Sequence, residues 1–182
     1  LTLGQSSAAF GSTNTVLGED SMSIGYSNVV GGYGSFALGY SNILEAGGSN
    51  SLVAGGFNKL SNWGTIITGS YNDVSAGNSI VVGNHNLING SDSGAIGVGL
   101  KLMDGYGQLV CGKYNVVNPD AMFIVADGDD DANRRNVFQV TVDGDAIVEN
   151  SVYCKDVQCE TINGGKPCTY AWDSSSGTLT IL

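Results

Sequence analysis

A repeat of about 14 residues runs through the first two thirds of the sequence. Its clearest mark is a glycine that closes a short run of one polar and three mostly apolar residues, as in residues 35–39 (SFALG). Successive glycines are 14, 14, 16, 14, 14, 14 and 15 residues apart, at Gly11, Gly25, Gly39, Gly55, Gly69, Gly83, Gly97 and Gly112. A period this short leaves no room for a helix. It predicts an all-β solenoid whose coils stack at the inter-strand distance of about 4.7–4.9 Å.

Two further positions recur behind each glycine. An Asn stands three residues after it in seven of the eight units, at Asn14, Asn28, Asn42, Asn58, Asn72, Asn86 and Asn115, with Leu100 in the remaining unit. An aliphatic residue follows two positions later and predicts a second short strand, at Val16, Val30, Leu44, Leu60, Val74, Ile88, Leu102 and Val117. We expect glycine at this position because the backbone has a positive φ there or passes too close to a neighbouring backbone for a Cβ atom. We expect the Asn to tolerate the left-handed region while bonding to local backbone. Binding of a sugar or an ion by the aligned Asn side chains is the alternative.

The run before each glycine carries apolar residues on both faces of its strand. Alternation places the middle residue of each triplet on one face and its two neighbours on the other. In residues 66–68 (IIT) and 80–82 (IVV) both sets contain branched aliphatic side chains. The side chains on one face of the strand fill the narrow interior of the coil. Those on the other face point outward and need another chain to shield them from water. We therefore predict self-association about an axis along the rod.

The S-x-A-x-G runs at 14-residue spacing, such as residues 35–39, resemble the YadA-like head repeat of trimeric autotransporter adhesins. The resemblance covers residues 3–118 and implies a left-handed parallel β-roll that is homotrimeric. The sequence departs from this pattern in the 16-residue coil before Gly55 and in residues 97–107. There we expect loops that bulge from the roll and offer places for recognition.

The composition changes near Pro119. Residues 119–182 hold both prolines, 11 of the 17 acidic residues and only five of the 28 glycines, so we expect a β-rich trimer or fibre module to follow the repeats of residues 1–118. Residues 122–148 resemble a segment of phage and prophage tail-fibre or baseplate proteins, in which an Asn-Arg-x-Asn loop precedes a strand and a D-G turn. The residues themselves predict strands at 123–126, 137–142 and 146–148, and a hairpin of 170–172 with 178–182.

The sequence lacks an evident catalytic set. His85 is the single histidine, and it occupies a repeat position that Tyr71 and Tyr114 share, which favours packing over catalysis. The alternative is an enzyme, a fibre-borne polysaccharide depolymerase. Such an enzyme needs a pair of carboxylates in a groove. The repeats contain Glu19, Asp20, Glu45, Asp73, Asp92 and Asp104, of which only the first two are adjacent. We predict that the protein is not an enzyme.

Two groups of residues are of metal-ligating types. Cys154, Cys159 and Cys168 lie close in sequence but lack the paired C-x-x-C spacing of zinc sites. The fourth cysteine, Cys111, lies in an apolar triplet, which predicts a small core residue. Residues 127–131 (DGDDD) resemble the start of a calcium loop without its later Glu, so we expect a solvated loop. We predict no metal and no cofactor, and leave the redox state of the cysteines open.

Charge narrows the choice of partners. A formal net charge of −10 argues against nucleic acid and anionic membranes, and no run of about 18 apolar residues marks a membrane span. We expect a non-enzymatic structural and attachment module of a trimeric phage or phage-like tail fibre. Its partners would be its own copies and a cell-surface glycan or protein, or a neighbouring fibre module. The head of a bacterial trimeric autotransporter adhesin is the alternative, so the expected location is the virion or the bacterial surface.

Overall fold

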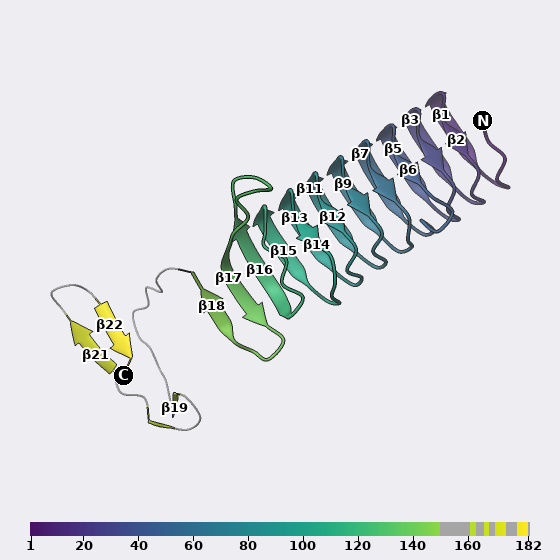
Figure 1. Ribbon diagram of the computed structural model, residues 1–182. Helices are drawn as coiled ribbons and strands as arrows, with labels where there is room; N and C mark the ends of the chain where they lie inside the picture. The colour runs from purple at the N-terminus through teal and green to yellow at the C-terminus, as the bar shows by residue number, and fades with distance from the viewer. Residues whose placement is uncertain (150–160, 163–165, 168–169, 174–177, 182) are drawn as a thin grey trace. The chain divides into compact units, whose positions relative to one another are not determined.

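The computed structural model describes residues 1–149 with their side chains, and the backbone of residues 161–162, 166–167, 170–173 and 178–181. It divides into two compact units, Leu1–Asn150 and Ser151–Leu182. Every regular element in these ranges is a β-strand, and the first unit is a row of stacked coils (Figure 1). The described residues include no helix long and apolar enough to cross a membrane.

Eight five-residue strands, one from each coil, form most of a long parallel sheet. They are β1 (Ala8–Ser12), β3 (Met22–Tyr26), β5 (Phe36–Tyr40), β7 (Leu52–Gly56), β9 (Ile66–Ser70), β11 (Ile80–Asn84), β13 (Gly94–Val98) and β15 (Leu109–Lys113). The register sets each repeat glycine beside the glycine of the next coil, as Gly69 beside Gly83. The predicted β-solenoid of stacked 14-residue coils is confirmed.

A second strand of two residues completes each of the first seven coils. These strands are β2 (Thr15–Val16), β4 (Val29–Val30), β6 (Ile43–Leu44), β8 (Lys59–Leu60), β10 (Asp73–Val74), β12 (Leu87–Ile88) and β14 (Lys101–Leu102). Inward residues from the two sheets, such as Ile67 and Val74, are fully buried and form a narrow aliphatic core. The middle residue of the triplet is therefore the inward one, as alternation predicts.

The short strand expected around Val117 does not form, and among the described strands the short sheet ends at β14. The side chain of Asn136 takes the place of a neighbouring strand. Its Oδ1 accepts from the backbone N of Val116 at 2.9 Å, and its Nδ2 donates to the carbonyl O of Val116 at 2.8 Å. Pro119 follows shortly after in the sequence, and it has no backbone N–H that could donate a hydrogen bond to a neighbouring strand.

Each coil turns twice, and each turn contains one residue in the left-handed region. Around β9 and β10 these residues are Gly64 (φ +70°) and Tyr71 (φ +58°), and the buried polar residues Thr65 and Asn72 follow them. Our expectation that the repeat Asn occupies the left-handed region was wrong, because the residue before it does. The Asn itself turns its side chain into the coil. The left-handed residues at this turn are Thr13, Ser27, Ser41, Phe57, Tyr71, His85, Gly99 and Tyr114.

The inward Asn side chains form a ladder along the solenoid. The Nδ2 of Asn72 donates to the Oδ1 of Asn58 at 2.9 Å and to the carbonyl O of Gly83, in the next coil, at 2.8 Å. The amide–amide bond repeats from Asn14 to Asn86, and Leu100 ends the run. Buried amides that bond to the coils on both sides serve the stack rather than a sugar or an ion.

A second ladder follows the other turn of each coil. The backbone N of Thr65 donates to the Oγ of Ser51 at 3.0 Å, and the Oγ1 of Thr65 donates to the carbonyl O of Ala76, in the next coil, at 3.1 Å. In the sequence these Ser and Thr residues serve only as markers of the repeat. In the fold they bond one coil to the next, so each coil is held at both of its turns.

The two irregular coils place their extra residues in the turn after the short strand. After β6 this turn spans residues 45–50, where the N of Gly48 donates to the carbonyl O of Glu45 at 2.8 Å. After β14 it spans residues 103–107. The long strands on both sides keep their register, with Phe36 beside Leu52. The loops expected from the spacing are therefore confined to one edge of the solenoid.

The long sheet continues beyond the repeats. The strand β16 (Ala121–Asp127) is parallel to β15 and sets Ala126 beside Gly112. Next come β17 (Asn136–Thr141) and β18 (Ala146–Val148), both antiparallel, joined by a turn in which Gly144 has φ +89°. These strands match the three predicted from the sequence. Because they extend the long sheet, the first unit runs past the boundary expected at residue 119 and ends at Asn150.

In the second unit the described residues form two antiparallel pairs. The strand β19 (Thr161–Ile162) pairs with β20 (Lys166–Pro167), and β21 (Tyr170–Asp173) pairs with β22 (Thr178–Ile181). The second pair corresponds to the predicted hairpin. Cys154, Cys159 and Cys168 lie outside the described residues.

The repeat glycines lie within the long strands, at their fourth position. Gly69 has φ +120°, and a Cβ at this residue would collide with the carbonyl O of Gly83 in the next coil. Positive φ and close approach, the two reasons considered from the sequence, therefore act together, but inside a strand rather than in a turn. Glycine is the residue that meets both demands.

We expect Gly69→Ala to lower the free energy of unfolding by about 3 kcal/mol or more, because it adds backbone strain and a backbone collision. Gly107→Ala is the matched control, since Gly107 also has a positive φ (+70°) but open space around its Cβ position. It should lose only about 1–2 kcal/mol. Urea unfolding followed by circular dichroism measures both, and equal losses would show that coil contact at the glycines is unimportant.

Candidate functional site

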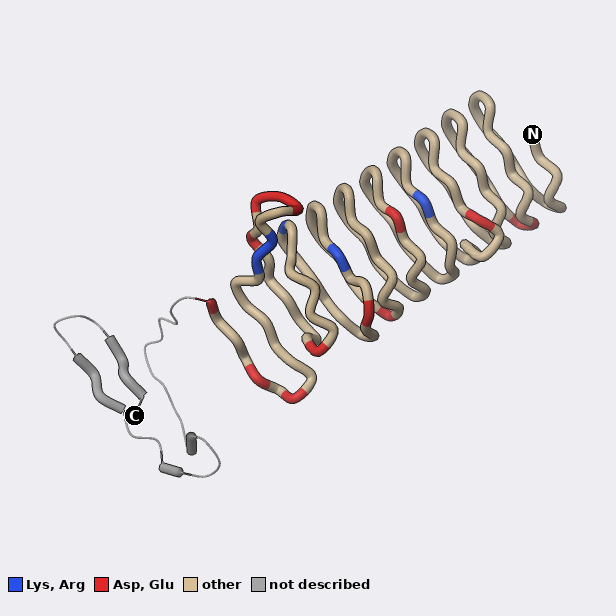
Figure 2. Tube along the Cα trace, in the orientation of Figure 1, with Lys and Arg blue, Asp and Glu red and all other residues tan. Residues whose placement is uncertain are grey.

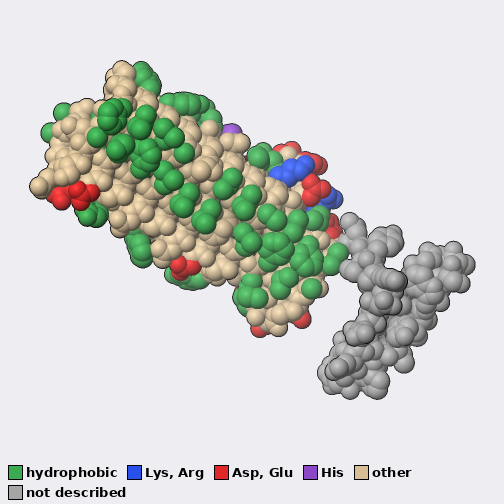
Figure 3. Space-filling model, turned by 180° about the vertical axis from the view of Figure 1, so that it is seen from behind, with side chains coloured by type: hydrophobic (Ala, Val, Ile, Leu, Met, Phe, Trp, Pro, Cys, Tyr) green, Lys and Arg blue, Asp and Glu red, His purple; other side chains and the backbone are tan. Residues whose placement is uncertain are grey.

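The outward side chains of the long strands form a continuous apolar surface, here called the outer apolar face. It consists of Met22, Ile24, Leu38, Leu52, Ile66, Ile80, Val82, Ile96 and Leu109, each between 36% and 52% exposed. They recur at the same strand positions in coil after coil, so the surface follows the long axis of the solenoid. In the view of Figure 3 apolar side chains extend along the first unit, and the charged ones lie toward its margins. Contiguous apolar surfaces of this kind occur where proteins bind one another, membranes or other ligands.

Cys111 lies on the outward side of the long sheet and not in the core. It is the third residue of its triplet, lies beside Val125 of β16, and is half-buried. The expectation of a core cysteine was wrong, because alternation along β15 turns Val110 inward and Cys111 outward.

A stack of aromatic rings follows one turn of the coils. Tyr40 meets Phe57 edge to face at 5.1 Å between ring centroids, Phe57 stacks on Tyr71 at 4.8 Å, and Tyr71 stacks on His85 at 5.0 Å. His85 thus takes the packing role predicted from its repeat position. Its imidazole face lies against a neighbouring ring, as those of Phe57 and Tyr71 do.

The carboxylates of the repeats are spread over the coils. Glu45 pairs with Lys59 at 3.1 Å, and Asp92 accepts from Asn78 at 3.0 Å. Within the repeats the acidic residues are distributed over several coils, and only Glu19 and Asp20 are adjacent in sequence (Figure 2). Neither of the two hollows found at the end of the solenoid is lined by a carboxylate of the repeats.

The acidic loop between β16 and β17 is clamped by cations. Asp127 pairs with Lys113 at 3.4 Å and with Arg135 at 3.0 Å, while Asp131 accepts from the Nζ of Lys101 at 2.7 Å. Within residues 1–149 no three His, Cys, Asp or Glu side chains are grouped so as to hold a metal ion. The loop is exposed as predicted, but its carboxylates anchor it to the last coils.

Arg134 of this loop covers the last coil. The Nη1 of Arg134 donates to the carbonyl O of Asn115 at 3.0 Å, and its guanidinium lies over the ring of Tyr114, 5.6 Å from the centroid. Such a cation–π contact adds to the hydrogen bond. The Asn-Arg-x-Asn segment, which in the sequence is only a point of resemblance, therefore caps the solenoid. The signal for this role was a pair of arginines within an acidic stretch.

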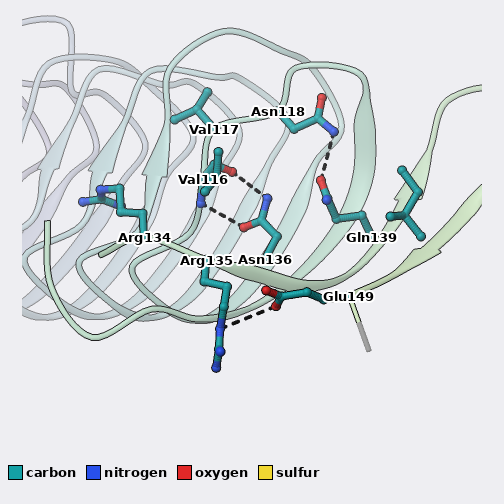
Figure 4. Close-up of a pocket in the computed structure, with 9 residues that line it drawn as sticks. Val116, Val117, Asn118, Arg134, Arg135, Asn136, Gln139 and Glu149 are labelled. Carbon is teal, nitrogen blue, oxygen red and sulfur yellow. Dashed lines mark hydrogen bonds and ion pairs between the residues drawn. The ribbon is translucent and has the colours of Figure 1, made fainter. Parts of the chain in front are cut away.

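A shallow hollow opens between this cap and β18 (Figure 4). It is lined by Val116, Val117, Asn118, Arg134, Arg135, Asn136, Gln139, Ile147 and Glu149. Asn118 donates to Gln139 at 2.9 Å, and the Nε of Arg135 pairs with Glu149 at 3.5 Å. These polar groups of the hollow therefore already bond to one another.

Hydrogen bonds from Lys101 and Arg134 lower the pKa of Asp131 to about 2. A hydrogen bond from Lys113 likewise lowers the pKa of Asp127. The ion pairs of these aspartates stabilise the folded loop fully above the ordinary aspartate pKa of about 3.9. Their contribution is lost as the pH falls through the lowered pKa of the folded protein, because the carboxylates then become protonated. Because the pairs are exposed, salt also weakens the clamp.

We expect Asp131→Asn to speed amide hydrogen exchange in residues 128–135, because it removes the partner of both Lys101 and Arg134. The exchange of the coils should stay unchanged. Asp145→Asn, in the β17–β18 turn, removes an exposed carboxylate that forms none of the ion pairs found within residues 1–149, and should leave the loop protected. Mass-spectrometric exchange at neutral pH measures both variants. An unchanged loop in Asp131→Asn would contradict the clamp.

No family model matches the chain, and no curated protein matches it.

Proposed function

We propose that the chain is a non-enzymatic structural and attachment module of a homotrimeric phage or phage-like tail fibre. The outer apolar face carries this proposal. Parallel sheets normally have both faces covered, and in a single chain the outward side chains of the long strands are uncovered. Association of identical copies through the outer apolar face covers these side chains, and it needs only the one surface that each copy already has.

The direction of the outer apolar face favours rotational symmetry about an axis parallel to the solenoid. Outward apolar side chains recur along the coils at the first strand position, as at Ile66 and Ile80, or at the third, as at Ile96, so copies that face a common axis bury them along the solenoid. Strands of five residues make this face narrow, and three such faces can enclose one shared core. A left-handed winding of each coil belongs to the same proposal, through the resemblance to YadA-like heads.

The trimer predicts a mass of about three times 18.7 kDa by light scattering at micromolar concentration. Ile80→Asp should shift this mass toward that of one chain, because it places a charge inside the shared core. Ile43→Asp is the control, since Ile43 is similarly exposed, at 44% against 52%, but lies on the outer side of the short sheet. A parent protein of monomer or dimer mass would refute the trimer.

Attachment without turnover is the expected activity. The coil carboxylates are dispersed, His85 is stacked on Tyr71, and the exposed polar turns recur along the solenoid. A trimer presents each weak contact three times, so avidity supplies firm attachment without a deep pocket. The segment of residues 122–148, which resembles tail-fibre proteins and extends the long sheet, supports a particle over a bacterial adhesin.

Incubation with panels of bacterial and host polysaccharides tests this activity. We expect retention of the protein on some of them with no release of sugar fragments, as measured by reducing-end assay and mass spectrometry. Sustained release of fragments that one Asp or Glu substitution abolishes would make the protein an enzyme and overturn the proposal.

A further inference from the structure

Three exposed aromatic side chains lie in the turns that lead into the long strands, at one edge of the solenoid. Tyr33, Trp63 and Tyr106 are 51%, 54% and 81% exposed. Each stands three residues before the first residue of a long strand, namely β5, β9 and β15, so all three occupy the same place in their coils. We call this row the aromatic edge.

The register of the coils sets the spacing of the aromatic edge. Two coil steps separate Tyr33 from Trp63, and three separate Trp63 from Tyr106. At about 4.7–4.9 Å for each step, these correspond to about 9.5 Å and about 14 Å along the solenoid. The same place in the intervening coils holds the small residues Ser49, Gly77 and Ser91. The three aromatic side chains therefore stand apart from one another.

The faces of these rings differ from those of the other aromatic row. Tyr40, Phe57, Tyr71 and His85 cover one another, whereas no ring of the aromatic edge stacks on another ring among residues 1–149. An uncovered aromatic face carries negative partial charge, and it attracts the weakly positive C–H groups of a sugar ring.

Hydrogen-bonding groups without positive charge lie between the rings. The turns of the intervening coils contain Asn50, Asn78 and Asp92, and the exposed Nδ2 of Asn78 donates to Asp92 at 3.0 Å. Asp20, in the turn before Tyr33, hydrogen-bonds to the Tyr33 hydroxyl and raises its pKa. Amide and carboxylate groups suit the hydroxyls of a sugar. The net charge of −10 disfavours an anionic chain.

We propose that the aromatic edge binds an extended, uncharged polysaccharide whose chain runs along the solenoid. The rings serve as stacking platforms at separations on the scale of one or more sugar units, and the polar turns bond to hydroxyls between them. This inference rests on the proposed attachment function and names its ligand class and site. The platforms lie in turns beside the outer apolar face, not within it, so assembly of the trimer and binding of the glycan use different side chains.

Affinity electrophoresis tests the aromatic edge. The full chain is run in native gels that contain soluble uncharged glucan, mannan or galactan, or an acidic polysaccharide as a charge control. We expect at least one uncharged polysaccharide to retard the parent protein. Trp63→Ala should weaken this binding by about tenfold, the scale of one lost stacking platform, and Trp63→Ala with Tyr106→Ala should weaken it further.

Tyr26→Ala is the matched control, because Tyr26 is 57% exposed but ends β3 at the opposite edge. It should bind like the parent, and all variants should keep the parent mass by light scattering. Retardation by acidic polysaccharide alone, equal binding by Trp63→Ala and the parent, or equal loss in Tyr26→Ala would overturn the aromatic edge. These outcomes leave attachment through another surface intact, whereas release of sugar fragments would overturn the attachment function itself.

Discussion

The close stacking of one coil on the next is the constraint on which the structure depends. At the repeat glycines a neighbouring carbonyl occupies the space of a Cβ, as Gly83 does for Gly69. The two polar ladders at the turns hold the coils together at this distance. Buried side chains such as Ile67 and Val74 fill the interior that results. Because the glycine, the Asn and the Ser or Thr serve one contact, they recur together.

Stacking also turns every position of the repeat into a column. Inward columns form the core and the ladders, and outward columns form surfaces whose character depends on the residue placed there. Aliphatic residues make the outer apolar face, and aromatic residues make either a closed stack, as around Phe57, or separate platforms, as at Trp63. A solenoid of this kind therefore presents elongated surfaces rather than pockets, which suits assembly and attachment better than catalysis.

The end of the stack requires a different solution, since a bare coil leaves backbone groups without partners. Here the loop before β17 folds back, and the side chain of Asn136 bonds to Val116 as a strand would. Arg134 bonds to the carbonyl O of Asn115, and the carboxylates of the loop hold the nearby lysines. The acidic residues of this loop, expected from the sequence to be solvated, also anchor the cap.

Within the repeats the sequence by itself determined the period, all strands but the one expected around Val117, and the alternation of inward and outward faces, because each follows from a pattern within one 14-residue unit. Tertiary structure decided what depends on contacts between distant residues. The clamp of Lys101 by Asp131 spans 30 residues, and the replacement of a strand at Val116 by Asn136 spans 20. Local pattern also misplaced the left-handed residue, since the buried Asn ladder needs its side chain turned inward and leaves the sharp bend to the residue before it. The aromatic edge likewise emerges only when the register aligns turns that lie 30 to 73 residues apart.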